Sequence, residues 1–342
     1  MMELPIITVV ISTFNGERWL KETLESVFSQ TYPKDKTEII VIDDGSTDSS
    51  ARLAKNLLAN SANPHQVKST TNQGINRANN LGWSLATGEW VLFLGHDDLL
   101  HPEKLNRSFA LTAPFESQVA AIYSNWQKYI PSDSGWTFND KWEETQLPKH
   151  ERYSMIRGLV EKHIYIHGSA IFFRKQWLSH VQGFDPDFKS AEDTNLQIRI
   201  DLADGKFIHV PSPTPLSYWR DTPGSWSKKG SYELARGIVH NMTLIEKTLK
   251  SEGIWDDKIR NSLAYFYFSS GRFLASKDWK TFVKVARHIQ ELQPDYLPTE
   301  AQIGRRNYWI CRTIGYTAFT ILGLIWHYLK LKKGILNLKD IR

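Results

Sequence analysis

Two adjacent carboxylates that end an apolar stretch are the side chains of this sequence best suited to chemistry. Residues 90–94 have the length and composition of a buried strand, and Gly95, His96, Asp97 and Asp98 follow. A strand that stops at paired Asp residues can deliver ligands for a hard cation to the edge of a sheet. Mg²⁺ or Mn²⁺ is commonly held by one or two carboxylates while a diphosphate fills other positions. The alternative is an Asp-rich turn or the cap of a following helix.

A second carboxylate pair, Asp43 and Asp44, follows the apolar run of residues 38–42. Gly45 permits a tight backbone turn, and Asp48 can cap the helix that comes next. A carboxylate at this place can accept hydrogen bonds from a ribose or from the imide of a pyrimidine base. The alternative is a loop capped by Asp48 in which the pair is merely solvated.

Strand and helix patterns alternate through the first hundred residues. The apolar runs at residues 6–11, 38–42 and 90–94 predict buried strands. Helices are predicted from Glu17 to Tyr32-Pro33, after Asp48 or Ser49, and over residues 76–86. This alternation indicates an α/β fold with a parallel sheet, in which ligands bind beyond the carboxyl ends of the strands. Both Asp pairs are therefore expected to face one crevice.

The remainder of the chain is less regular and then becomes helical. Further strands are predicted at residues 120–123, 170–173 and 207–210, and helices from Ser231 to about Gln302. We expect one domain over residues 1–230, with a nucleotide-binding half (1–104) and an acceptor half (105–230). A helical region over residues 231–342 would follow it.

Residues 308–333 form an apolar tail flanked by basic side chains. Its uninterrupted part, residues 313–326, is shorter than the roughly 20 residues that a spanning helix needs. A packed or dimer-forming helix, an interfacial membrane anchor and a true span all stay open.

Composition narrows the class of protein. The chain has 342 residues, of which 41% are hydrophobic and 23% charged, as in globular proteins. A single cysteine excludes an internal disulfide and a Cys-based zinc site, and fits a reducing compartment. The net charge of +5 favours phosphate ligands or an anionic membrane but is too diffuse to indicate nucleic-acid binding. The start lacks the features of a signal peptide, so we expect a cytoplasmic protein, with a peripheral contact at the membrane face left open.

The ordered motifs resemble family 2 glycosyltransferases of the GT-A fold, over roughly residues 5–220. The matching segments are residues 9–16, 24–33, 43–48, 72–80 and 86–98. The resemblance implies a mostly parallel sheet flanked by helices and a nucleotide-sugar donor, with UDP as the default nucleotide. It places Thr13 and Glu17 beside the base and ribose and Asp44 on the nucleoside. Gly74 and Arg77 would lie near the nucleotide, with Arg77 as a phosphate partner.

The family usually ends this strand with Asp-x-Asp-Asp, whereas this chain has Gly95 at the first acidic position. Asp97 falls on the position expected to hold Mn²⁺ or Mg²⁺, and Asp98 follows it. His96 could substitute for the lost carboxylate as a hydrogen-bond donor, although oxygen ligands suit these metals better than imidazole does.

A second site is implied by residues 183–186 followed by Glu192 and Asp193. In the resemblance, Asp193 is the general base that takes the acceptor's proton, and Glu192 is a neighbouring or acceptor contact. Both could instead simply begin a helix, where acids suit the positive end of the dipole. His167 could contact donor or acceptor, or be an ordinary turn histidine. Arg220 could pair with phosphate oxygens.

The leading hypothesis is therefore an inverting, metal-dependent glycosyltransferase that acts on a glycan or lipid-linked acceptor in surface-glycan synthesis, with a homodimer among the oligomeric states left open. A nucleotide-sugar-binding pseudoenzyme with a regulatory or scaffolding role is the alternative, kept open by Gly95. A nucleotidyltransferase would need a glycine-rich, basic loop after the first strand, and residues 12–16 do not provide one. A dinucleotide oxidoreductase is disfavoured because no Gly-x-Gly-x-x-Gly follows that strand.

The membrane hypothesis rests on the tail alone and can be tested by removing it. If the tail anchors the protein, deletion of residues 304–342 will move the protein from the membrane fraction to the soluble fraction, as measured by fractionation and immunoblotting. An unchanged distribution would contradict the hypothesis.

Overall fold

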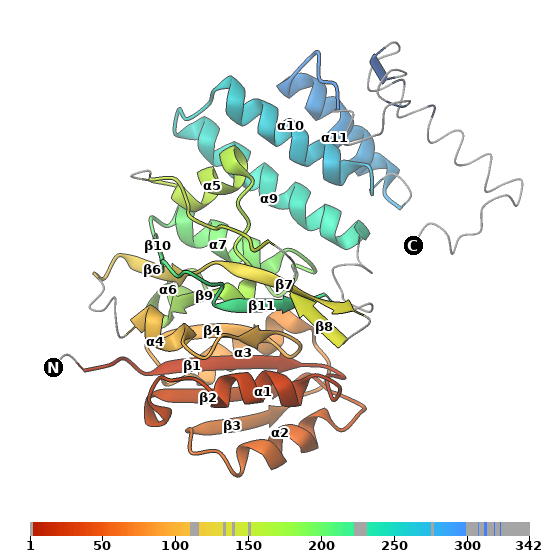
Figure 1. Ribbon diagram of the computed structural model, residues 1–342. Coiled ribbons are helices and arrows are strands. Elements are labelled where there is room, and N and C mark those ends of the chain that lie inside the picture. Colours follow the sequence, from red (N-terminus) through yellow and green to blue (C-terminus); the bar gives the residue numbers. More distant parts are fainter. Residues whose placement is uncertain are drawn as a thin grey trace, which may run out of the picture. The chain divides into compact units, whose positions relative to one another are not determined.

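In the computed structural model, the chain divides into two units (Figure 1). One unit comprises Met1–Phe188 and Glu192–Pro223, and the other comprises Lys189–Ala191 and Gly224–Arg342. The described residues are 3–109, 116–132, 135–138, 141–149, 152–221, 231–274 and 277–298, with the single residues 307, 311, 312, 318 and 322. The domain boundary expected after residue 230 stays a prediction.

A seven-stranded sheet with the order β10-β6-β9-β4-β1-β2-β3 forms the centre of the first unit. Its neighbouring strands are parallel, except that β9 runs antiparallel to both β4 and β6. The predicted α/β fold with a mostly parallel sheet is confirmed. The strands are β1 (Ile7–Thr13), β2 (Thr37–Asp43), β3 (His65–Ser69), β4 (Trp90–Gly95), β6 (Val119–Tyr123), β9 (Ile171–Arg174) and β10 (Lys206–His209).

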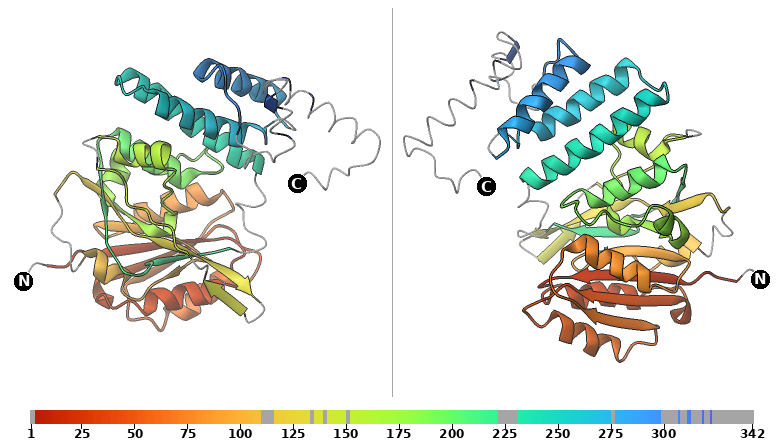
Figure 2. Two further views of the ribbon diagram at one scale, coloured as in Figure 1. Left: turned by 45° about the horizontal axis from the view of Figure 1, so that its top comes forward. Right: turned by 180° about the vertical axis from the view of Figure 1, so that it is seen from behind.

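Helices cover both faces of this sheet, which explains why β1 and β4 are apolar and buried along their length. Helix α1 lies on the face turned toward the viewer in Figure 1, and α3 on the face seen from behind in Figure 2. Gly82 lets α3 approach β1 closely, because a Cβ there would lie 2.2 Å from Val10 Cγ1. The helices are α1 (Leu20–Phe28), η1 (Lys34–Lys36), α2 (Ser50–Leu58), α3 (Ile75–Leu85), α4 (Lys104–Phe109), α5 (Ser154–Lys162), η2 (Gly168–Ala170), α6 (Lys175–His180) and α7 (Glu192–Leu202).

A second sheet of four strands has the order β5-β11-β7-β8. It consists of β5 (Leu99–Leu100), β11 (Ser217–Arg220), β7 (Trp126–Ser132) and β8 (Gly135–Phe138). Because β5 follows the Asp97-Asp98 pair directly and pairs with β11, this sheet brings Arg220 to that pair. The sequence patterns did not predict it.

The strand registers align the ends of β1, β2 and β4. Thr13 lies opposite Asp43, and Ser12 lies opposite Gly95. We call this alignment of strand ends the carboxyl edge. Since β9 is antiparallel to β4, the turn that precedes it, η2, reaches the same edge.

The second unit contains α9 (Ser231–Ser251), α10 (Asp257–Gly271) and α11 (Trp279–Leu292), and α10 packs against both others. The side chains of Asp256 and Asp278 cap α10 and α11 by accepting from Ile259 N and Thr281 N, at 2.9 and 3.0 Å. The helices predicted after Ser231 are therefore present.

One buried carboxylate, that of Glu246 on α9, joins all three helices. It accepts hydrogen bonds from Lys250 Nζ (2.6 Å), from Tyr267 Oη on α10 (2.9 Å) and from His288 Nε2 on α11 (2.7 Å). Glu291 also faces His288 Nδ1, at 3.1 Å. Burial opposes the charge of Glu246, but these donors lower its pKa from 4.5 to about 2. The hydrogen bond to Glu246 raises the pKa of His288 above its ordinary 6.5.

The apolar tail predicted at residues 308–333 lies almost wholly outside the described residues. Within the described part of the chain, no helix combines the length and hydrophobicity needed to cross a bilayer.

We predict that Glu246→Gln lowers the free energy of unfolding by about 2 kcal/mol, because Tyr267, His288 and Lys250 lose a charged acceptor. The depressed pKa of Glu246 means that its contribution is present above pH 4.5 and is lost as the pH falls toward 2. The contribution of His288 is present below pH 6.5 and is lost as the pH rises through its raised pKa. Chemical denaturation from pH 3 to pH 9 measures both effects. Glu252→Gln, placed just after the same helix, is the matched control, and equal losses in the two variants would contradict the prediction.

Candidate active site

Asp98 is the buried centre of the carboxyl edge. Its Oδ2 accepts a short hydrogen bond from Ser169 Oγ, and its Oδ1 accepts from the backbone N of Arg220 at 3.3 Å. His167 Nδ1 lies 3.9 Å from Oδ2. Burial, and then the charge of Asp97, raise the pKa of Asp98 to about 8. Asp97 is only partly buried, so it is the member of the pair more open to a ligand.

Arg220 is wholly buried beside this pair. Its Nε donates to the carbonyl oxygen of Asp97 (2.8 Å), and its Nη2 donates to Glu22 Oε2 (2.6 Å). The guanidinium also lies over the Trp19 ring, 4.5 Å from the ring centroid. The structure therefore shows Arg220 as a buried side chain that holds the backbone of Asp97, and its predicted role as a phosphate partner stays a prediction.

Gly95 is closely covered by the two carboxylates that follow it. A Cβ at this position would lie 2.9 Å from Asp98 Oδ2 and 3.2 Å from Asp97 Oδ1. A side chain at residue 95 would therefore require the Asp97 and Asp98 carboxylates to shift. Gly95, which departs from the family pattern in the sequence, is thus closely packed against these two carboxylates.

Asp44 ties β2 to the start of α3. Its Oδ1 accepts from Gln73 N (2.9 Å) and Thr70 Oγ1 (3.3 Å), and its Oδ2 accepts from Gly74 N (2.8 Å). Gly74 has a positive φ of 93°, which explains a glycine at this place. Asp44 N in turn donates to Thr13 O (2.8 Å), so these three candidate nucleotide residues lie together.

The side chains of Thr13 and His96 both pack against Gly16. A Cβ added to Gly16 would lie 2.4 Å from Thr13 Oγ1 and 2.6 Å from His96 Cδ2. The Thr13 hydroxyl is buried, with no hydrogen-bond partner among the described residues. Glu17 is exposed, and its Oε2 accepts from Ser49 N (2.9 Å), so it helps to cap α2.

Arg77 lies on the exposed side of α3. Its Nη2 is 3.6 Å from Asp187 Oδ1, and nearly half of its side chain is exposed. Arg77 therefore forms an ion pair at the surface. Of the predicted nucleotide residues, Thr13, Asp44, Gly74 and His96 thus lie at the carboxyl edge, Glu17 caps a helix beside it, and Arg77 points toward Asp187.

Asp193 and Asp98 lie on either side of the His167–Ser169 turn. A Cβ added to Gly168 would be 3.6 Å from Asp193 Oδ2, which is ordinary van der Waals contact, while Ser169 bonds Asp98. His167 starts η2 by accepting from Ser169 N at 3.3 Å, and burial lowers the pKa of His167. The structure therefore brings the predicted base and the predicted metal ligands to one place.

Asp193 occupies the first turn of α7, as the alternative interpretation also expected. Its Oδ1 accepts from Thr194 N (2.7 Å), and its Oδ2 accepts from Tyr165 Oη (2.7 Å). Glu192 precedes it, and burial together with the Asp193 charge raises the pKa of Glu192 to about 7. Gln197 Nε2 anchors the helix to the carbonyl of Ile166 at 2.9 Å.

Comparisons with known proteins place the chain in a family. The family model of glycosyl transferase family 2 matches residues 8–181. The chain belongs to this family.

Individual relatives in the family are distant. An uncharacterized glycosyltransferase of Haemophilus influenzae is 33% identical over 106 residues, which cover 31% of this chain and 42% of that protein. The putative glycosyltransferase EpsH of Bacillus subtilis is 31% identical over 148 residues, 42% of each chain. The matches span 27% to 42% of the length of the first curated relatives.

Two solved glycosyltransferases share the fold. The mannosyltransferase PcManGT from Pyrobaculum calidifontis, solved with GDP-Man and Mn²⁺, has a TM-score of 0.57 at 18% identity and covers 95% of this chain and 88% of its own. Residues 1–349 of S. aureus TarS, solved with UDP-GlcNAc, have a TM-score of 0.54 at 18% identity and cover 87% of this chain and 95% of their own.

The carboxylates at the edge fit a divalent cation through their chemistry. Two adjacent acids repel each other, and the buried one has a raised pKa, so a cation beside them would favour their ionised form. Within the described ranges, no group of three or more His, Cys, Asp or Glu side chains is arranged to hold a metal. A metal bound by Asp97 and Asp98 therefore needs further ligands from substrate or water, as Mg²⁺ commonly has.

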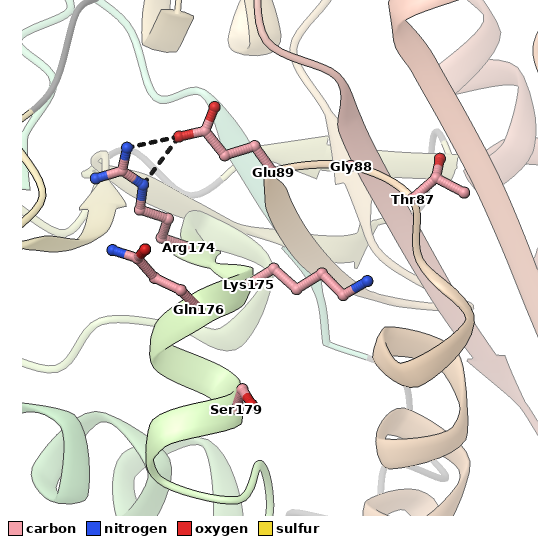
Figure 3. A pocket seen from close by; sticks show the side chains of 7 residues that line it. All are labelled: Thr87, Gly88, Glu89, Arg174, Lys175, Gln176 and Ser179. Carbon is pink, nitrogen blue, oxygen red and sulfur yellow. Dashed lines mark hydrogen bonds and ion pairs between the residues drawn. The ribbon is translucent and has the colours of Figure 1, made fainter.

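A cavity of about 530 Å³ lies at the opposite end of β4 (Figure 3). Its Arg174 pairs with Glu89 (2.7 Å) and donates to the carbonyl of Glu116 (2.9 Å), and its Lys175 donates to the carbonyl of Ala86. These cations serve partners within the protein, and the cavity lies away from the acids of the carboxyl edge.

The sequence analysis predicted no role for several residues that the structure places at the site. Tyr165, Ser169 and Glu22 act through contacts that join distant segments, so no local spacing indicates them. Lys104 is buried and donates to Ser124 Oγ at 3.2 Å, and burial lowers its pKa to about 7. The sequence around His167 does not reveal that the Ser169 hydroxyl donates to an acid.

We predict that Gly95→Ala lowers the free energy of unfolding by about 1–2 kcal/mol, because the added methyl group forces the Asp98 carboxylate off Ser169. Gly168→Ala is the matched control, since its Cβ finds ordinary contact distances. Urea denaturation of both variants measures the difference. The steric account is wrong if Gly95→Ala is as stable as Gly168→Ala.

Proposed function

We propose that this protein transfers a sugar, with inversion, from a nucleotide-diphosphate sugar to an acceptor hydroxyl in a metal-dependent reaction. The observation that carries the proposal is the convergence at the His167–Ser169 turn. Asp98, which follows Asp97 at the end of β4, reaches it through Ser169, and Asp193 reaches it from the start of α7. Membership of glycosyl transferase family 2 supports the same reaction class.

The nucleotide would lie along the ends of β1 and β2. Thr13 has a buried hydroxyl without a described partner, which a ligand could satisfy. Asp44 would reach the nucleoside, and Glu17 would flank the base and ribose. Gly74 presents a helix start without a side chain. Arg77 would leave its surface ion pair with Asp187 to meet the phosphates.

The diphosphate would lie against the end of β4, where Asp97 and Asp98 would hold Mn²⁺ or Mg²⁺. Such a metal, when bound, neutralises charge that develops on the leaving diphosphate. His96 would donate a hydrogen bond in place of the missing first carboxylate. Arg220 keeps the Asp97 backbone in position and adds positive charge close to the pair.

The acceptor would approach from the side of Asp193. Its hydroxyl oxygen forms the new bond to the anomeric carbon as the bond from that carbon to the phosphate oxygen breaks. Asp193 takes the hydroxyl proton, and a positioned base of this kind supplies about 10²- to 10⁴-fold in rate. Glu192, whose pKa is raised to about 7, can hydrogen-bond an acceptor hydroxyl as donor or acceptor. His167 lies in the turn between Asp98 and Asp193 and can contact the donor or the acceptor.

The apolar, basic-flanked tail of the sequence suggests a biological setting for this reaction. We place the acceptor among glycans or lipid-linked precursors of a surface polysaccharide or glycolipid. The protein would act in the cytoplasm, in contact with the membrane through the basic-flanked tail at residues 308–333, either alone or as a homodimer. UDP is the default nucleotide, and GDP is the first alternative.

We predict that one class of nucleotide sugar raises the thermal stability of the wild type in the presence of Mn²⁺. At 100 times its dissociation constant, a ligand stabilises the native state by about 2.7 kcal/mol. Thermal shift with UDP-GlcNAc, UDP-glucose and GDP-mannose, each with and without Mn²⁺, measures the effect. Asp97→Ala should abolish the dependence on Mn²⁺.

Glu103→Ala is the control, because this partly exposed acid, just before α4, pairs with Arg107. Stabilisation by a nucleotide sugar without turnover would favour the pseudoenzyme. The absence of stabilisation by any of the three probes would contradict the donor site.

A further inference from the structure

Tyr165 forms a hydrogen bond with the carboxylate of the candidate base, Asp193. Its hydroxyl donates to Asp193 Oδ2 at 2.7 Å, while the backbone N of Thr194 donates to Oδ1 at 2.7 Å. A carboxylate with one donor on each oxygen cannot rotate freely. Each carboxylate oxygen has two lone-pair sites, so Oδ2 retains one for the proton of an incoming hydroxyl.

Tyr165 is itself held in place from behind. The indole Nε1 of Trp126 donates to its carbonyl oxygen at 3.1 Å, and the Trp126 ring meets the Tyr165 ring edge-on, with centroids 6.0 Å apart. Gln197 of α7 bonds the next carbonyl, that of Ile166. The Tyr165–Asp193 hydrogen bond therefore joins two segments that are separately fastened, which is the condition for precise positioning.

Tyr165 is also exposed to solvent beside the candidate base. The residue is 39% exposed, whereas the neighbouring Trp126 is only 4% exposed. The His167 ring also lies against it, with centroids 6.2 Å apart. A hydroxyl group that reaches Asp193 Oδ2 thus carries the rest of its molecule past this ring. Flat aromatic surfaces with a few convergent polar groups are typical of binding sites.

We propose that Tyr165 is a positioning residue for Asp193 and that its exposed ring is the surface on which the acceptor's sugar ring lies. This inference rests on the proposed transfer reaction and adds the acceptor class, a carbohydrate hydroxyl carried on a pyranose ring. The phenol hydroxyl keeps its own proton throughout. The proton of the acceptor passes to Asp193 Oδ2, and the electron pair of the broken bond leaves with the diphosphate.

The hydroxyl and the ring of Tyr165 can be tested separately by steady-state kinetics on the full chain. The donor probe is whichever of UDP-GlcNAc, UDP-glucose and GDP-mannose stabilises the wild type with Mn²⁺. Acceptor probes are methyl β-D-glucopyranoside and glycerol, which has hydroxyl groups but no ring, and release of the nucleoside diphosphate is measured. Tyr265→Phe is the matched control, because Tyr265 is equally exposed, at 39%, and lies on α10.

Tyr165→Phe should lower kcat by about 10- to 100-fold while the acceptor KM stays within twofold, because only the orientation of the base is lost. Tyr165→Leu should lower kcat equally and also raise KM for methyl glucoside at least fivefold, but not KM for glycerol. Donor-induced stabilisation should be the same in both variants as in the wild type, which excludes a general folding defect.

The inference is overturned if Tyr165→Phe retains kcat within twofold of the wild type, or if Tyr165→Leu leaves KM for methyl glucoside unchanged. If only donor hydrolysis is detected, the same loss of kcat in Tyr165→Phe supports the positioning role, and an unchanged rate contradicts it. A wild type that turns over none of the donors refutes the transfer reaction itself, and the Tyr165 inference falls with it. That failure differs from the others because the Tyr265→Phe control is then inactive too.

Discussion

The buried carboxylate of Asp98 is the constraint on which the candidate site depends. It receives the hydroxyl of Ser169 and the backbone N–H of Arg220, so three segments that are far apart in the sequence meet at one side chain. An acid this deeply buried is stable only when its oxygens are satisfied, and its raised pKa records the remaining cost of charging it. A divalent cation at Asp97 would lower that cost. The burial that makes this acid costly to ionise is therefore also what would favour a cation beside it.

The position of the base depends on the nucleotide-binding half of the sheet. Asn80 of α3 accepts from Phe184 N (2.9 Å) and donates to Phe184 O (2.8 Å), and Asn76 donates to the carbonyls of Asp185 and Phe188. This loop leads toward α7. Helix α3, which begins at the Asp44–Gly74 contact, therefore also holds the loop preceding the helix that carries Asp193. Donor and acceptor sides of the proposed reaction share one rigid element.

The sequence predicted the parts of the fold that local patterns determine. The apolar runs of β1, β2 and β4 are buried strands because both faces of a parallel sheet are covered, and the two acid pairs lie where β2 and β4 end. Strand β3 was missed because it lies at the edge of the sheet and is mostly polar and exposed. The antiparallel direction of β9 was also missed, since strand direction has no local signature.

The contacts of two site residues, Arg220 and Tyr165, could not be predicted from the sequence, because they form between segments that are distant along the chain. The role of Arg220 as a phosphate partner stays a prediction, and the sequence does not indicate that the pairing of β11 with β5 buries this side chain against Asp97 and Glu22. Tyr165 is 28 residues from the acid that it contacts. Gly95 departs from the family pattern in the sequence, and only the structure shows that two carboxylates lie close to where its Cβ would be.

The most direct test of the account is a crystal structure of the full chain with Mn²⁺ and UDP-GlcNAc or GDP-mannose, with anomalous diffraction recorded to locate the manganese. The account predicts manganese within coordination distance of an Asp97 carboxylate oxygen and of the diphosphate, and an anomeric carbon that faces Asp193. Manganese elsewhere, or a donor whose anomeric carbon is directed away from Asp193, would contradict it.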